Sequence, residues 1–156
     1  MTIEEKQLLL KDLCARLPYG VKVSIRSDYT GTLETMELNC FHLDSTYSIE
    51  YRMLRPYLRP MSSMTEDELR EFAKLKFKND DIWEIVEFPE MKFGFKGFIN
   101  VQCRNKNNGD TWFYQVGTRT PLETYWGIDW LNEQHFDSRG LIEKFLALPA
   151  PKEMYK

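Results

Sequence analysis

The sequence lacks the features that mark a membrane protein, a disulfide-stabilised domain or a strongly basic nucleic-acid-binding domain. No window contains enough consecutive apolar residues to span a bilayer. Its 21 basic and 24 acidic side chains leave a net charge of -3, so no overall positive field attracts nucleic acid or anionic lipid. The three cysteines, Cys14, Cys40 and Cys103, are odd in number and lack metal-ligand spacing, which favours a reducing compartment. We therefore expect a cytoplasmic protein without a membrane partner.

Two further absences narrow the chemistry. Gly94 and Gly97 lack the third glycine and the lysine that a phosphate-binding loop requires. Residues 1–6 contain neither a basic stretch nor the start of a long apolar run, so we expect no signal peptide. We also expect no cofactor.

The composition is that of a folded protein. Hydrophobic residues make up 42% and charged residues 29% of the 156 residues, which excludes disorder. A chain of this length can bury a core without disulfides or metals, and we predict one globular domain over residues 1–156. Aromatic residues are abundant, with 10 Phe, 8 Tyr and 4 Trp. We expect most rings in the core; the alternative is that some Tyr and Trp are exposed and stack on a ligand.

Three helix starts share one signature, a threonine followed three residues later by a glutamate, which together cap the first backbone N–H groups. The pairs are Thr2 with Glu5, Thr65 with Glu68, and Thr120 with Glu123. The first helix should run to about Arg16, the second should follow Thr65, and the third should cover residues 122–130. A fourth helix is predicted from Asp137 or Ser138 to Leu146, before the prolines at 149 and 151.

Between the first two helices the apolar pattern alternates, which predicts strands over residues 21–25, 33–41 and 47–54. Residues 98–103 and 111–116 flank Asn108-Gly109, a strong hairpin signal. Residues 82–88 fit either a helix or a strand. The order predicts an α+β fold: an antiparallel sheet of about five strands, a three-strand meander plus a hairpin, packed by an N-terminal helix, a middle helix and two C-terminal helices. A binding site is expected on the open sheet face or in a groove between helix and sheet.

Two regions carry a family resemblance. Residues 55–65 contain Pro-Tyr-Leu, a further Pro and Ser-Ser-Met-Thr, and residues 128–154 contain Trp-Leu-Asn, His-Phe-Asp and Arg-Gly-Leu-Ile. With Tyr-Gly-Val-Lys at 19–22, these stretches resemble a family of small proteins from gut bacteria, their prophages and other mobile elements. The resemblance covers about a third of the chain and carries no catalytic residue. Phe145 stands where it leads us to expect a small residue.

The two histidines occur in the same short pattern, His42 with Asp44 and His135 with Asp137. Residues two apart in a strand share a face, so the first pair can bind a metal or form an oriented base. If the fold joins the pairs, the four side chains form a metal site. The alternative is that Asp137 caps the following helix or pairs with Arg139. Cys40 can share a strand face with His42, but nothing in the sequence supplies the oxyanion hole of a cysteine nucleophile.

Two acid-free stretches, residues 51–60 and 91–109, interleave basic residues with rings, as single strands or nucleotides require. The alternative is solvated Lys and Arg with Phe turned inward. The candidate contact residues are Arg52, Arg55, Tyr57, Arg59, Lys92, Lys96 and Arg104.

These patterns predict a non-enzymatic binding protein. The resemblance implies a phage or mobile-element accessory that contacts a host macromolecule, with counter-defence as one such role. The expected partner is a host protein, a nucleotide or a nucleic acid. Two alternatives stay open: a nucleotide or single-stranded nucleic-acid binding protein, and a small metal-dependent enzyme that uses the two histidine–aspartate pairs. A monomer and a homo-oligomer are both compatible with the sequence.

Overall fold

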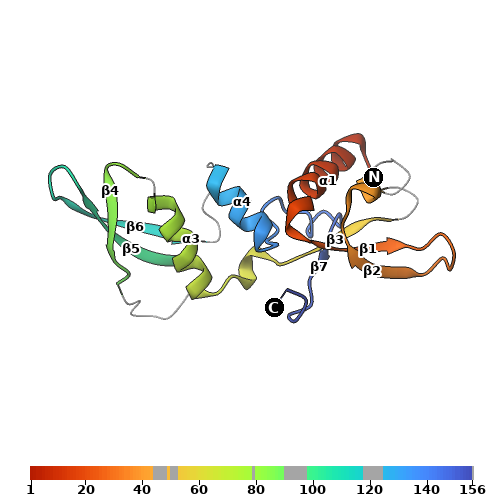
Figure 1. The fold of residues 1–156 in the computed structure, drawn as a ribbon. Coiled ribbons are helices and arrows are strands. Elements are labelled where there is room, and N and C mark those ends of the chain that lie inside the picture. The colour runs from red at the N-terminus through yellow and green to blue at the C-terminus, as the bar shows by residue number, and fades with distance from the viewer. Residues whose placement is uncertain (44–48, 50–52, 79, 90–97, 118–124, 156) are drawn as a thin grey trace. The chain divides into compact units, whose positions relative to one another are not determined.

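The computed structural model describes residues 1–43, 49, 53–78, 80–89, 98–117 and 125–155. They form two compact units: unit 1 comprises Met1–Pro60 and Leu131–Lys156, and unit 2 comprises Met61–Trp130. Helices and strands occur in both units (Figure 1), so the predicted α+β class is confirmed. The single domain expected over residues 1–156 stays a prediction.

Unit 1 contains a four-stranded sheet. Its elements are α1 (Ile3–Arg16), the 3₁₀ helices η1 (Leu17–Tyr19) and η2 (Cys40–Leu43), and the strands β1 (Lys22–Arg26), β2 (Leu33–Glu37), β3 (Arg55–Leu58) and β7 (Leu148–Pro149). The order is β2-β1-β3-β7, in which β1 pairs antiparallel with β2 and β3, and β3 pairs parallel with β7. This order corrects the predicted meander, because β3 pairs with β1 and not with β2.

The third strand also begins later than predicted. β3 starts at Arg55, whereas Met53 and Leu54, the end of the predicted strand over residues 47–54, lie outside any strand. Residues 47, 48 and 50–52 lie outside the described part of the chain.

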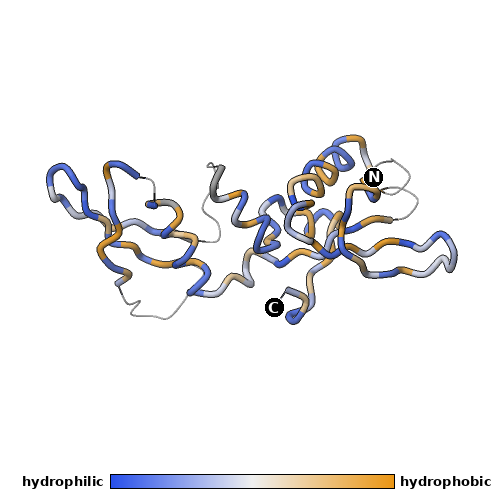
Figure 2. The backbone as a smooth tube through the Cα atoms, in the orientation of Figure 1, coloured by the Kyte–Doolittle hydropathy of each residue, from blue (hydrophilic) through white to orange (hydrophobic). Residues whose placement is uncertain are grey.

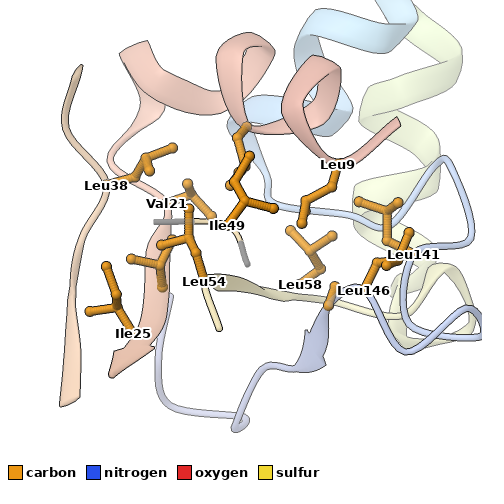
Figure 3. Packing of buried hydrophobic residues seen from close by; sticks show 12 residues of the cluster. Leu9, Val21, Ile25, Leu38, Ile49, Leu54, Leu58, Leu141 and Leu146 are labelled. Carbon is orange, nitrogen blue, oxygen red and sulfur yellow. The ribbon is translucent and has the colours of Figure 1, made fainter. Parts of the chain in front are cut away.

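α1 begins where the sequence predicts. The hydroxyl of Thr2 accepts the N–H of Glu5, and the carboxylate of Glu5 accepts the N–H of Thr2, which completes a capping box. Leu9 and Leu13 are fully buried and belong to the apolar core of unit 1, together with Leu58 of β3 (Figure 3). The spacing of four residues places both leucines on one face of the helix.

Unit 2 contains a three-stranded antiparallel sheet in the order β4-β5-β6. Its elements are the 3₁₀ helix η3 (Met61–Ser63), α3 (Glu66–Lys78), β4 (Trp83–Glu87), β5 (Phe98–Asn105) and β6 (Thr111–Gly117). The predicted hairpin is confirmed as β5 and β6, whose hydrophilic turn is visible in Figure 2. The ambiguous segment 82–88 contains a strand, β4. The described residues therefore form two sheets, whereas the sequence predicts one.

α3 packs on one face of this sheet (Figure 1). Its predicted capping box is confirmed, because the hydroxyl of Thr65 accepts the N–H of Glu68 at 3.3 Å and the Glu68 carboxylate accepts the N–H of Thr65 at 2.8 Å. The buried residues of this layer are Leu69, Phe72, Ala73 and Phe77 on α3 and Ile99, Val101, Cys103 and Val116 on the sheet. Alternate residues of β5 and β6 thus form the inner face.

The third predicted helix is confirmed as α4 (Tyr125–Glu133), which begins in unit 2 and ends in unit 1. Its predicted capping pair, Thr120 and Glu123, lies outside the described residues.

The fourth predicted helix is wrong, since residues 137–146 form turns. The carboxylate of Asp137 accepts the backbone N–H groups of Leu141 and the next residue, each at 2.8 Å, in the manner of a helix cap. However, Gly140 and Phe145 have φ values of 66° and 58°. Left-handed residues cannot continue a right-handed helix, so the capped segment stays a turn.

Candidate functional site

Three consecutive aromatic residues of β6 are exposed. Trp112, Phe113 and Tyr114 have 62%, 70% and 48% of their surface accessible. Trp112 and Tyr114 are paired across the hairpin with Cys103 and Val101, both of which are buried on the face that α3 covers. Because consecutive side chains in a strand point to opposite faces, the Trp112 and Tyr114 rings belong to the helix-covered face. They stay exposed although they share a face with the core.

A cavity of about 470 Å³ lies beside these rings, within unit 2. Its lining residues are Phe77, Asp80, Trp83, Cys103, Trp112, Phe113 and Tyr114. The Phe77 ring, from the last turn of α3, meets the Tyr114 ring edge-on, with centroids 6.0 Å apart and planes at 80°. We call this cavity the aromatic pocket. It is a groove between helix and sheet, one of the two places in which the sequence analysis expects a binding site.

Among the described residues, Asp80 is the one charged residue in the lining of the aromatic pocket. Its carboxylate oxygen Oδ1 accepts the backbone N–H groups of Ile82 and Trp83, both at 2.9 Å, at the start of β4. The backbone carbonyl of Asp80 accepts the ammonium of Lys106 at 2.6 Å. These bonds fix the carboxylate at the rim before any ligand arrives. The pocket therefore combines aromatic faces with one negative charge, and both attract an organic cation.

Of the predicted basic surface, the structure brings three residues together. Arg55, Tyr57 and Arg59 alternate along β3 and its extension with the buried Pro56 and Leu58. All three are half-buried, so part of each side chain serves packing. They form one face of a strand, because alternate residues of a strand point to the same side.

Arg59 packs against other parts of unit 1 and is not a fully solvated side chain. Its guanidinium lies 4.1 Å from the centroid of the Phe136 ring, its N–H donates to the carbonyl of His135, and its carbonyl accepts the N–H of Asp137. The cation–π contact with Phe136 uses the charge of Arg59 inside the protein. Tyr57 also has a partner within the protein, because its hydroxyl lies 3.4 Å from the Thr35 hydroxyl.

Arg104 belongs to unit 2, where its guanidinium lies 3.9 Å from the Glu84 carboxylate. Arg52, Lys92 and Lys96 lie outside the described residues. Their role stays a prediction.

The histidine–aspartate pairs differ from the pattern that the sequence suggests. His42 lies in η2 and not in a strand, and its Nδ1 accepts the N–H of Asn39 at 3.1 Å. The strand face expected for Cys40, His42 and Asp44 is therefore wrong for the first two, and Asp44 lies outside the described residues. Both oxygens of Asp137 are used by the turn that follows it. Among the described residues, no three His, Cys, Asp or Glu side chains gather where they could hold a metal.

The His135 ring packs against Tyr155 in a stack with centroids 3.9 Å apart. Burial first, and then the neighbouring positive charges of Arg16 and Arg59, lower the pKa of His135 from 6.5 to about 4. Burial raises the pKa of Tyr155 to about 12. Both rings are therefore neutral at pH 7, and His135 serves the fold as a packed aromatic ring.

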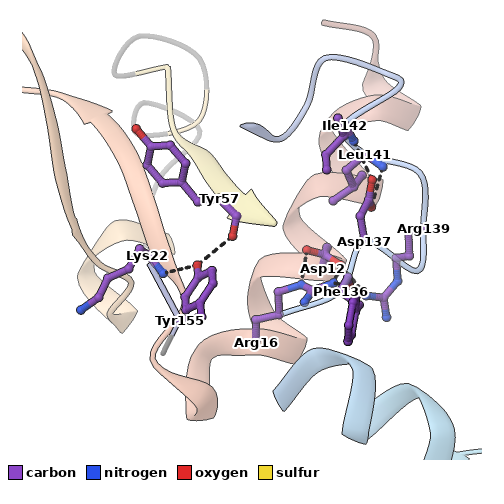
Figure 4. Close-up of polar contacts among 10 residues, drawn as sticks. All are labelled: Asp12, Arg16, Lys22, Tyr57, Phe136, Asp137, Arg139, Leu141, Ile142 and Tyr155. Atoms are coloured by element: carbon purple, nitrogen blue, oxygen red, sulfur yellow. Dashed lines mark hydrogen bonds and ion pairs between the residues drawn. The ribbon is translucent and has the colours of Figure 1, made fainter. Parts of the chain in front are cut away.

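Unit 1 contains a buried charge cluster that the sequence does not predict (Figure 4). Arg16 donates to the Asp12 carboxylate at 2.7 and 3.1 Å and to the carbonyl of Phe136 at 2.7 Å. Arg139 donates to the same carboxylate at 2.6 Å, so its partner is Asp12 and not Asp137. The available signal was the position of Asp12 and Arg16 on the leucine-bearing side of the first helix. The cluster ties α1 to the C-terminal segment.

The sequence also missed the aromatic pocket as a set of residues. Only the alternative of exposed rings and the expectation of a groove between helix and sheet pointed to it. Neither Trp83 nor Asp80 belongs to a recognisable motif.

Comparison with known proteins gives no relative from which a role can be transferred: no protein-family model, curated protein or solved structure matches the chain. A search of the described residues for a helix with the length and apolar character needed to cross a membrane found none.

Proposed function

We propose that this protein is a non-enzymatic binding protein whose aromatic pocket receives an organic cation presented by a partner macromolecule. The observation that carries the proposal is the lining of the pocket, in which several rings accompany one charge, the carboxylate of Asp80. Lysine, methylated lysine and other alkylammonium groups share the required chemistry. The pocket volume of about 470 Å³ is within the range of ligand sites.

The physical basis is the negative face of an aromatic ring. A cation held against a tryptophan ring gains roughly 0.5–2 kcal/mol, and more than one ring can contribute. Methylation increases this preference, because a quaternary ammonium is weakly hydrated and leaves water more easily. Asp80 adds a complementary charge at the rim.

The same lining argues against the nucleotide alternative at this pocket. A phosphate is usually bound by Lys, Arg or a helix N-terminus, and the lining residues within the described part of the chain include neither Lys nor Arg. On the opposite face of the sheet, Arg104 is close to Glu84, which offsets its charge. Nucleotide binding is therefore the competing outcome of the test below.

The biological setting is proposed from the sequence resemblance alone. Under this proposal the protein is an accessory of a phage or mobile element, and the partner is a host protein that displays a lysine or methyl-lysine side chain. Counter-defence is one role that such a contact serves.

Calorimetric titration tests the proposal. The ligands are choline, a short peptide with one trimethyl-lysine, the same peptide with unmodified lysine, and AMP. We expect saturable binding of the trimethyl-lysine peptide and none of AMP. Tighter binding of the peptide than of choline supports a protein partner; equal binding identifies a small quaternary ammonium compound as the ligand. Preferential binding of AMP overturns the cation proposal.

Variants locate the binding. Trp112→Ala removes an exposed ring and should weaken peptide binding about tenfold, equivalent to about 1.4 kcal/mol. Asp80→Asn keeps an oxygen for the N–H groups of Ile82 and Trp83 but removes the charge, and should weaken binding about threefold, or roughly 0.7 kcal/mol. Tyr29→Ala is the control, because Tyr29 is 99% exposed and belongs to unit 1. An unchanged affinity in Trp112→Ala places the ligand elsewhere.

A further inference from the structure

A second cavity, of about 360 Å³, lies within unit 1. Its lining includes Met53, Leu54, Arg55, Lys144, Phe145 and Leu146. We call it the unit 1 cavity. These residues come from the segment that leads into β3 and from the turns before β7. One part of this lining is apolar, and another carries two positive charges.

Two residues that line this cavity have an unusual backbone conformation, with positive φ values. In the described chain, three residues other than glycine have positive φ values: Met53 at 51°, His135 at 60° and Phe145 at 58°. Such a conformation is unfavourable for a residue with a side chain and persists only where something else compensates. For His135 the compensation is visible, since its buried ring stacks on Tyr155.

Within the described part of the chain, Met53 and Phe145 show no such compensation from packing. Their surfaces are 39% and 79% exposed, so the core gains little from either side chain. Both line the same cavity. A glycine would adopt the positive φ at each position without strain, but the chain has a large apolar side chain there. Strained residues with exposed side chains beside one cavity are typical of a surface shaped for contact with a ligand.

The charge of the lining is positive. Arg55 and Lys144 contribute two cations, and within the described part of the chain neither forms an ion pair. Glu5 also lines the cavity and contributes one negative charge, which its hydrogen bond from the N–H of Thr2 holds in the capping box of α1, so the two cations leave these three side chains with a net positive charge. The cavity therefore attracts an anion, whereas the aromatic pocket of unit 2 attracts a cation.

We propose that the unit 1 cavity binds an amphipathic carboxylate, a medium-chain acyl or aromatic acid. The apolar part of the ligand contacts Met53, Leu54 and Phe145, and its carboxylate pairs with the cations Arg55 and Lys144. Apolar walls with a few charged groups that fix orientation are the usual composition of a small-molecule site. Arginine suits this role because its guanidinium binds a carboxylate through two parallel hydrogen bonds. The proposal stands on unit 1 alone and does not depend on the aromatic pocket.

The test is a titration of the full chain with decanoate, followed by calorimetry and by NMR of isotopically labelled protein. We expect saturable binding and chemical-shift changes at Met53, Phe145 and Leu146. Decyltrimethylammonium, which has the same chain and the opposite charge, should bind at least tenfold more weakly. Decanoate that shows no saturable binding, or that shifts only residues outside this lining, overturns the proposal, as does equal binding of the two amphiphiles.

Two variants separate the charge from the apolar contact. Arg55→Glu combined with Lys144→Glu should weaken decanoate binding at least tenfold and reverse the preference between the two amphiphiles. Phe145→Gly should weaken it severalfold while the protein stays folded, because glycine accepts the positive φ. The control combines Lys11→Glu with Lys152→Glu, which changes the net charge equally at two exposed positions of unit 1 outside the lining. Equal losses in the control and the first variant would show a long-range charge effect and no specific site.

Discussion

The ring of His135 lies against the ring of Tyr155, with centroids 3.9 Å apart and planes at 26°. The Tyr155 hydroxyl accepts the N–H of Lys22 at 3.0 Å and donates to the carbonyl of Tyr57 at 2.7 Å (Figure 4). Lys22 precedes Val23, and Tyr57 follows the Pro56 with which Val23 is paired, so the phenol bridges β1 and β3 where their own pairing ends. The Tyr155 side chain thus links β1 to β3 through its hydroxyl and packs against His135 through its ring.

The pKa of His135 predicts how stability depends on pH. The folded protein binds this proton near pH 4, whereas the unfolded chain binds it near pH 6.5. The contribution to stability is therefore complete above pH 6.5 and is lost as the pH falls towards 4, by roughly 3 kcal/mol at most. Urea unfolding at intervals between pH 7 and pH 4 measures the loss. His135→Asn, which tolerates the positive φ, should show a smaller loss; an identical pH dependence in both proteins refutes the assignment.

Removal of the Tyr155 hydroxyl should weaken unit 1. Tyr155→Phe keeps the stack on His135 but leaves the N–H of Lys22 and the carbonyl of Tyr57 without their partner. An unpaired buried polar group costs about 1–3 kcal/mol, and we expect a fall of that size in the free energy of unfolding. Tyr29→Phe, at a residue that is 99% exposed, should change it by less than about 0.5 kcal/mol. Equal effects of the two substitutions would contradict the bridging role.

The chain contains a buried and an exposed version of the same ion pair. Asp12 and Arg16 are fully buried, whereas the side chains of Glu66 and Arg70, also four residues apart, are 39% and 31% exposed. Asp12→Ala leaves Arg16 and Arg139 without their carboxylate partner and should lower the free energy of unfolding by about 3–5 kcal/mol. Glu66→Ala should cost less than about 1 kcal/mol. Denaturant titration measures the loss of unfolding free energy in both variants. Similar losses would contradict the expectation that burial makes the Asp12 ion pair more important to stability than the Glu66 ion pair.

Backbone strain at Phe145 predicts an unusual gain. Phe145→Gly removes an unfavourable φ of 58° from a side chain that is 79% exposed, so unit 1 should keep its stability or gain up to about 1 kcal/mol. Gly140→Ala should lose about 1 kcal/mol, because the φ there is 66°. A methyl group at Gly140 meets only the Lys144 ammonium at 3.6 Å, so the loss comes from the backbone. Thermal unfolding measures both, and a clear loss in Phe145→Gly would show that its ring stabilises the fold.

The sequence predicts the elements that local interactions specify. The capping boxes at Thr2 and Thr65 each involve residues three apart, and both helices begin there. The hairpin around Asn108-Gly109 is likewise local, with Gly109 at a φ of 79°. Strand order depends on distant contacts, and the sequence gives no signal that β3 pairs with β1 and not with β2.

The failed helix and the missed pocket have separate causes. Asp137 and the apolar spacing that follows it are typical of a helix. The sequence does not predict the left-handed backbone at Phe145, because phenylalanine rarely adopts a positive φ. In β6, Trp112, Phe113 and Tyr114 are consecutive, so alternation does not identify an inner face. The exposure of these rings is a property of the packed unit.

The most direct test of the cation-binding proposal uses the indole N–H signals of the tryptophans in a two-dimensional NMR spectrum. Addition of the trimethyl-lysine peptide should shift the signals of Trp83 and Trp112, which line the aromatic pocket. The signal of Trp130, which is 7% exposed and packs against Phe72, should stay in place. The contradictory result is a spectrum in which Trp83 and Trp112 do not move at saturating peptide, or in which AMP moves them and the peptide does not.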